Sequence, residues 1–120
     1  MTSREIEMCV ADCLQDDEIE SVDSILRTLN HEYGSSWQTA RGRAFTAEEV
    51  RSALDRLMTA GQVKPYCEQP PLDGCRPIPS DQVGTAFPWD DVWFHLEQSG
   101  RDAVREWWEA KGREKFPLEP

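Results

Sequence analysis

Residues 45–66 read FTAEEVRSALDRLMTAGQVKPY and decide the fold, because they contain a complete helix followed by the start of a strand. Thr46 and Glu49 have the spacing of a capping box at a helix N-terminus. Gly61 stands where a glycine commonly ends a helix. We therefore expect a helix over 46–60 that turns at this glycine into a strand.

One face of this helix is apolar. Its apolar residues follow the i, i+3, i+4, i+7, i+8 spacing of a buried helix face, namely Val50, Ala53, Leu54, Leu57 and Met58. Phe45 precedes the cap and fits a hydrophobic staple against Val50. The pattern predicts that this helix lies at the centre of the core.

The rest of the chain predicts three more helices and a pair of strands around a long loop. Caps, apolar periodicity and glycine stops set the limits of each element. The helices run from Thr2 to about Gln15, from Asp17 or Ser21 to Gly34, and from about Gly100 to Lys111 after a Ser99 cap. The strands cover 62–68 and 92–96, residues 35–44 form a polar connector, and 69–91 form a Pro- and Gly-rich loop.

The stretch from Trp93, WFHLEQSGRDAVREWWE, resembles the strand, turn and helix that follow the wing in bacterial winged-helix regulators. The pattern is Leu-x-x-x-Gly-Arg, carried here by Leu96, Gly100 and Arg101, and the resemblance is at the level of the fold over roughly residues 20–110. It implies a mainly α winged helix with three helices, a two-stranded wing and a C-terminal helix. We expect one such domain over 1–116, with its long wing loop at 69–91 and a short tail at 117–120.

The chain is acidic, with 120 residues and a formal net charge of −10. This charge argues against non-specific binding to nucleic acid or to an anionic membrane. No apolar run is long enough to span a bilayer, and the N-terminus lacks the apolar region of a signal peptide. Four cysteines in such a chain are expected to be reduced thiols, which indicates a cytoplasmic protein.

A nucleic-acid surface would have to use residues 36–64, whose five basic and three acidic residues give a net charge of +2. The candidate residues are Arg41, Arg43, Arg51, Ser52, Arg56 and Lys64. A winged helix reads DNA through the N-terminal part of its third helix, where this chain has Glu48 and Glu49. These glutamates repel phosphates, and phosphate contacts supply most non-specific affinity.

Metal and catalytic signals are weak. Cys67 and Cys75 flank the start of the long loop and are the weak candidates for a metal or redox pair, without the close spacing of a zinc site. His95 and Glu97 could form a carboxylate–histidine group, but the sequence has no nucleophile elbow and no phosphate loop. We therefore expect no cofactor, no bound metal and no enzymatic activity.

Aromatic residues near the C-terminus are the candidates for protein contacts: Phe87, Trp89, Trp93, Trp107 and Trp108. Trp is favoured in interface hot spots, although the same residues could fill the chain's own core. The resemblance also suggests a homodimer through the terminal helices. The favoured hypothesis is a non-catalytic winged-helix module that acts through protein–protein interaction and could serve regulation. The alternative is a DNA-binding transcriptional regulator that uses helix 46–60 with the basic residues named above.

Overall fold

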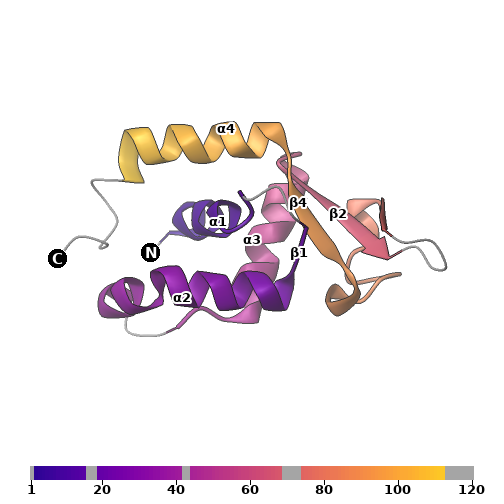
Figure 1. Cartoon of the computed structure of the whole chain (residues 1–120), viewed down its shortest axis with the longest axis horizontal. Helices are drawn as coiled ribbons and strands as arrows, with labels where there is room; N and C mark the ends of the chain where they lie inside the picture. The colour runs from indigo at the N-terminus through magenta and orange to yellow at the C-terminus, as the bar shows by residue number, and fades with distance from the viewer. Residues whose placement is uncertain (1, 16–18, 42–43, 69–73, 113–120) are drawn as a thin grey trace.

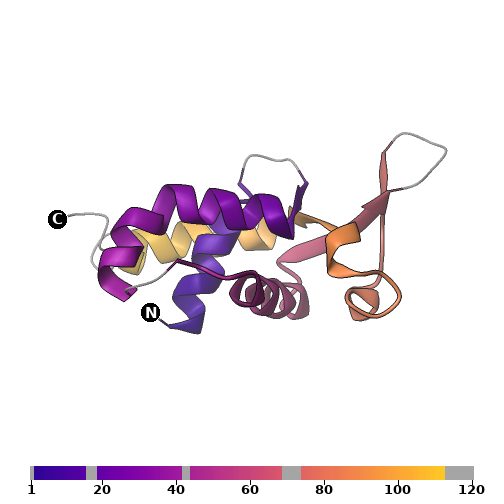
Figure 2. The same cartoon turned by 90° about the horizontal axis from the view of Figure 1, so that it is seen from below.

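The computed structural model describes residues 2–15, 19–41, 44–68 and 74–112, with 33–41 and 111–112 described for their backbone only. In chain order the main elements are α1 (Ser3–Asp12), β1 (Glu20–Ser21), α2 (Val22–Arg41), α3 (Ala47–Thr59), β2 (Val63–Glu68), β3 (Cys75–Pro77), β4 (Trp93–Leu96) and α4 (Gln98–Trp107). The helices gather at one end of an elongated molecule and the sheet forms the other end (Figure 1). Seen from below, α2 crosses in front of α1 and α4 (Figure 2). The predicted tail at 117–120 lies outside the described residues.

Helix α3 forms as the sequence predicts. The Thr46 hydroxyl accepts a hydrogen bond from the Glu49 amide, and the Glu49 carboxylate accepts one from the Thr46 amide, so the capping box is complete. All five residues of the predicted apolar face are buried. At the other end, Gly61 has φ 73°, and the amides of Gly61 and Gln62 donate to the carbonyls of Met58 and Leu57. This is a Schellman motif, which satisfies the last carbonyls of the helix.

The sheet is larger than the predicted two-stranded hairpin. It has four antiparallel strands in the order β1-β4-β2-β3, so the fold is a mixture of helices and sheet rather than mainly α. β1 has two residues and β3 has three, and such short segments carry no readable alternation of polar and apolar residues. Both form because a longer strand, β4 or β2, offers them backbone partners.

The boundaries of α1, α2 and α4 differ from the prediction, and α1 ends at Asp12 rather than near Gln15. α2 continues through Gly34 to Arg41, so the connector expected at 35–44 is largely helical. A single glycine inside a helix costs only about 1 kcal/mol relative to alanine, and no proline follows it to stop the helix. α4 begins at Gln98 rather than near Gly100, and Ser99 lies inside its first turn instead of capping it.

Side chains hold the start of α2 and connect its middle to the start of α3. Ser21 accepts a hydrogen bond from the Ser24 amide, as the predicted cap should, whereas Asp17 lies outside the described residues. Further along, the Asn30 amide group bonds both the N–H and the carbonyl of Phe45, at 2.9 and 3.3 Å. Asn30 thereby fixes the position at which the chain enters α3.

The segment predicted as a long loop is ordered where the structure describes it, over 74–91. After β3 it makes two short 3-10 turns, η1 (Ser80–Gln82) and η2 (Trp89–Asp91), and Ile78 is buried against the core. The indole of Trp89 stacks on Phe94 of β4, with ring centroids 5.8 Å apart. The prolines thus end regular structure without preventing the segment from packing.

α4 approaches the turn between α3 and β2 closely enough to require a glycine. A Cβ atom on Gly100 would lie 2.5 Å from the carbonyl oxygen of Gln62 and would also overlap the side chain of Leu96. That same carbonyl accepts a hydrogen bond from the Glu97 amide, and the Ser99 hydroxyl donates to the carbonyl of Gly61. Arg101 then reaches across to the Gln15 carbonyl beyond α1 at 2.7 Å. The Leu-x-x-x-Gly-Arg pattern is therefore the junction that joins α4 to the α3–β2 turn and to α1.

Substituting Leu54 by Ala is expected to lower the free energy of unfolding by about 2–5 kcal/mol, because its side chain is fully buried and its loss leaves a cavity. Urea denaturation followed by circular dichroism measures this. An exposed residue of the same helix, Asp55, is the matched control, and Asp55→Ala should stay within about 0.5 kcal/mol of the parent.

Gly100→Ala is expected to destabilise the protein by about 1–3 kcal/mol through overpacking at the junction. Helix propensity alone would change stability in the opposite direction, by about 1 kcal/mol in favour of alanine. Thermal denaturation should therefore show a lower melting temperature for Gly100→Ala and an unchanged one for Glu106→Ala, an exposed position of α4. A raised melting temperature for Gly100→Ala would contradict the close approach.

Candidate functional site

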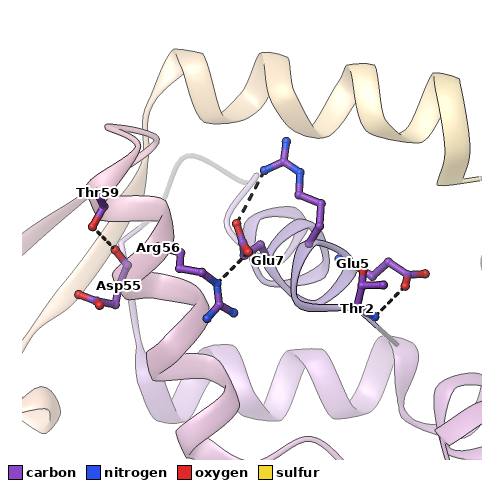
Figure 3. A network of polar contacts seen from close by, with 7 residues as sticks. Thr2, Glu5, Glu7, Asp55, Arg56 and Thr59 are labelled. Carbon is purple, nitrogen blue, oxygen red and sulfur yellow. Dashed lines mark hydrogen bonds and ion pairs between the residues drawn. The ribbon is translucent and has the colours of Figure 1, made fainter.

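The outer face of α3 is not basic. Glu48, Ser52 and Asp55 are exposed along it. Arg56 is turned toward α1, where its Nε lies 2.8 Å from the carboxylate of Glu7 (Figure 3). Arg4 approaches the other oxygen of the same carboxylate at 3.7 Å. One of the two cations of α3 is thus already paired within the protein.

The other nucleic-acid candidates do not form one surface with α3. Arg51 is half-buried, and its Nε is shielded from solvent with no hydrogen-bond partner among the described residues. Lys64 is exposed, but it lies on the sheet, opposite His95 of β4. The side chain of Arg41 and the whole of Arg43 lie outside the described residues. The described part of the chain therefore presents no cluster of free cations on α3.

The structure separates Cys67 from Cys75. In the antiparallel pairing of β2 with β3, Cys67 lies opposite Arg76 and Cys75 lies opposite Glu68. Because successive residues of a strand point to opposite faces, the two thiols lie on opposite faces of the hairpin. Both are free cysteines, Cys67 buried and Cys75 partly exposed. Within the described ranges, no group of three or more His, Cys, Asp or Glu side chains could hold a metal ion.

Most of the aromatic residues predicted to bind a partner belong to the core. Trp107 is only 8% exposed, and it meets the half-buried Trp108 edge to face with centroids 5.3 Å apart. Phe87 and Trp89 also pack against the core. This packing favours the alternative that these residues fill the chain's own core. Positions in an irregular segment and at the end of a helix give no periodicity from which burial can be read. Trp93 is the exception.

Trp93 lies on the face of the sheet that the helices do not cover. Along β4, Phe94 and Leu96 are buried while Trp93 and His95 are partly exposed, and β2 alternates in the same way. Trp93 lies directly opposite Tyr66 of β2, and the Tyr66 and His95 rings meet edge to face at 6.4 Å. The sheet therefore carries aromatic side chains on its solvent side, where an antiparallel sheet with one covered face normally has polar ones.

We call this surface the outer sheet face and define it by Lys64, Tyr66, Glu68, Trp93 and His95. In addition, Ile19 lies immediately before β1 and is 37% exposed. Among the described residues, no other large hydrophobic side chain is classed as exposed. Aromatic and aliphatic side chains held on rigid strands lose little conformational freedom when they are covered, so such a surface favours association with another molecule. Sequence reasoning placed Lys64 and Trp93 in different sites and missed Tyr66. The alternation of buried and exposed positions along β2 and β4 was the signal that could have placed these three residues on one face.

The His95–Glu97 pair is the arrangement nearest to a catalytic group. Nδ1 of His95 lies 2.8 Å from the Glu97 carboxylate, and the two side chains are 30% and 35% exposed. A carboxylate can orient a histidine in this way, but catalysis also needs a nucleophile or a bound substrate near the other ring nitrogen. Among the described residues, no serine, threonine or cysteine is hydrogen-bonded to His95. The pair therefore orients the ring on the outer sheet face.

Comparison with known proteins places the chain in no family: no protein-family model, curated protein or solved structure matches it significantly. In the part of the chain that the structure describes, none of the helices combines the length and the apolar character needed to cross a bilayer. Function must therefore be argued from the surface itself.

Cys75 provides a test of the geometry around β3. Burial raises the pKa of its thiol, and electrostatic interactions with Glu68 and then with Cys67 raise this pKa further. A raised pKa leaves less thiolate at a given pH, so iodoacetamide should modify Cys75 more slowly at pH 8 than it modifies a cysteine in a short peptide. Glu68→Gln removes one of the charges and should shift the pH profile of alkylation, followed by intact mass, to lower pH. A profile at or below that of the peptide would contradict the environment described.

Proposed function

We propose that this chain is a winged-helix module that acts by binding protein through its outer sheet face, without catalysis. The order of elements supports the winged helix. A helix and the short strand β1 precede the helix pair α2 and α3, and the strands β2 and β4 then pair on either side of a long excursion. β1 closes the sheet beside β4, so three strands pack in the order β1-β4-β2 against the helices.

The ion pair between Arg56 and Glu7 is the observation that favours protein over DNA as the binding partner. A winged helix that reads DNA places its third helix in the major groove and anchors it through cations on phosphates. Here Arg56, one of the two arginines of that helix, neutralises a carboxylate of α1, and the other, Arg51, is half-buried. Glu48 and Asp55 add negative charge to the exposed side of α3. Breaking the pair to bind a phosphate would leave Glu7, whose side chain is only 13% exposed, without its closest partner.

DNA binding is the second candidate function. The net charge of +2 over 36–64 favours it, and Arg41 and Arg43 stand just before α3 in the sequence. In that case the basic contacts would come from the segment that precedes α3 and not from α3. The two functions predict opposite results in one assay.

We expect no binding to a mixed-sequence 25-base-pair duplex in fluorescence anisotropy, either at 20 mM or at 150 mM salt. Electrostatic DNA binding rises steeply as salt falls, so the low-salt arm is the sensitive one. The control is Glu48→Lys with Asp55→Lys, two exposed substitutions that make the outer side of α3 basic. Low-salt binding of this variant would show that the assay detects a basic third helix on this scaffold.

The proposal would be overturned in favour of the DNA-binding candidate by two results together. The unmodified protein would bind the duplex at low salt and more weakly at higher salt, and the double variant Arg41→Ala with Arg43→Ala would lose this binding. Loss in that variant with an unchanged melting curve would assign the contact to the segment before α3.

A further inference from the structure

We infer that the outer sheet face binds a second copy of this chain, face to face, about a two-fold axis that crosses β2 near Tyr66. The inference rests on the proposed protein-binding function and names the partner for that same face. Its starting point is the order of outward-facing residues along β2, which is Lys64, Tyr66, Glu68. A positive charge, an aromatic ring and a negative charge follow one another at equal spacing.

This order is self-complementary. A two-fold axis that lies in the interface and runs perpendicular to the strands reverses the direction of β2 in the second copy. With the axis at the level of Tyr66, Lys64 of one copy lies over Glu68 of the other. Each charge is two residues from Tyr66, roughly 7 Å along the strand, so the two distances match. The symmetry forms the pair twice, once at each end.

Both charges are available for such pairing. The side chains of Lys64 and Glu68 are exposed, and neither has an ion-pair partner among the described residues. Most described arginines, by contrast, are already bonded within the chain: Arg4, Arg27 and Arg56 to carboxylates, Arg101 to a carbonyl and Arg105 to Asp102. The outer sheet face therefore keeps an unpaired charge of each sign, whereas most of the described arginines are bonded within the chain.

The aromatic residues lie where the axis would pass. Tyr66 and Trp93 are directly opposite each other in the sheet, and Pro77 of β3 lies beside Tyr66 on its other side. In the second copy the same row would pack against this one, as the inner faces of two stacked sheets do at about 10 Å. The row supplies apolar burial at the centre, with charge pairs on both flanks, which is the general arrangement of an interface.

Charge complementarity selects a second copy over other protein partners. A basic peptide laid along β2 would meet Lys64, and an acidic one would meet Glu68. Only a partner with the reversed order of charges satisfies both, and the chain itself has that order. Since two copies each carry a net charge of −10, their general repulsion limits the strength of the dimer and makes it dependent on concentration.

Sedimentation velocity from 1 to 200 µM at 150 mM salt, with the full chain, tests the inference. The wild type should shift from a 13.8 kDa monomer toward a dimer as concentration rises. Lys64→Glu and Glu68→Lys should each weaken dimerisation at least tenfold, because each replaces two attractions by two repulsions. The double variant Lys64→Glu with Glu68→Lys should recover an affinity within about threefold of the wild type, because the order of charges is reversed in both copies.

The control is Glu106→Lys, a charge reversal of the same size and sign as Glu68→Lys on the exposed side of α4. It should leave dimerisation unchanged, whereas an association through the terminal helices would respond to it. Circular dichroism checks that each variant is folded. We expect all of them to fold, because the three substituted side chains are exposed.

Three outcomes would overturn the inference: a wild type that stays monomeric at 200 µM, a double variant that does not recover, or a dimer lost in Glu106→Lys. None of these bears on the DNA assay, which tests the proposed function separately. A monomer that also fails to bind DNA would leave the outer sheet face as the site for a different protein.

Discussion

The close contact between α4 and the turn after α3 is the constraint on which the rest of the architecture depends. The carbonyl of Gln62 accepts a hydrogen bond from the amide of Glu97, the residue before α4, and leaves no room for a side chain on Gly100. That carbonyl is in place only because Gly61 adopts a left-handed conformation at the end of α3. Two glycines, Gly61 in the turn after α3 and Gly100 in α4, therefore set how α3, β2, β4 and α4 meet.

The elements whose stability is local could be predicted from the sequence. The caps of α1 and α3, the apolar face of α3 and its glycine stop each involve residues within about four positions of one another, so their signals are readable without tertiary information. The strands β1 and β3 could not be predicted, because two or three residues become a strand only when a neighbour supplies hydrogen bonds. The predicted end of α2 at Gly34 was wrong for a related reason. A glycine ends a helix only if the chain after it turns away.

The sequence predicted the acidic character of α3 but not which aromatic side chains lie together on the surface. The sequence already shows that α3 opens with two glutamates, and the structure adds that Arg56 is engaged by Glu7. The aromatic residues were harder to assign, because Trp89 and Trp93 are four residues apart and are directed to opposite sides of the sheet. Trp89 stacks on the buried Phe94, whereas Trp93 lies opposite Tyr66 on the uncovered side. Composition identifies residues that can bind, and only strand register says which of them are free to do so.

The short edges of the sheet limit how this protein can assemble. β1 offers only two residues at one edge, and β3 offers three at the other, the last of them Pro77, which has no N–H to donate. An incoming strand would find few backbone groups to pair with, so growth by adding strands is disfavoured at both ends. The aromatic rings instead lie on a face, and two faces packed about a two-fold axis leave no further face to extend. The aromatic face can thus be exposed to solvent while the described edges of the sheet give a further strand little to pair with.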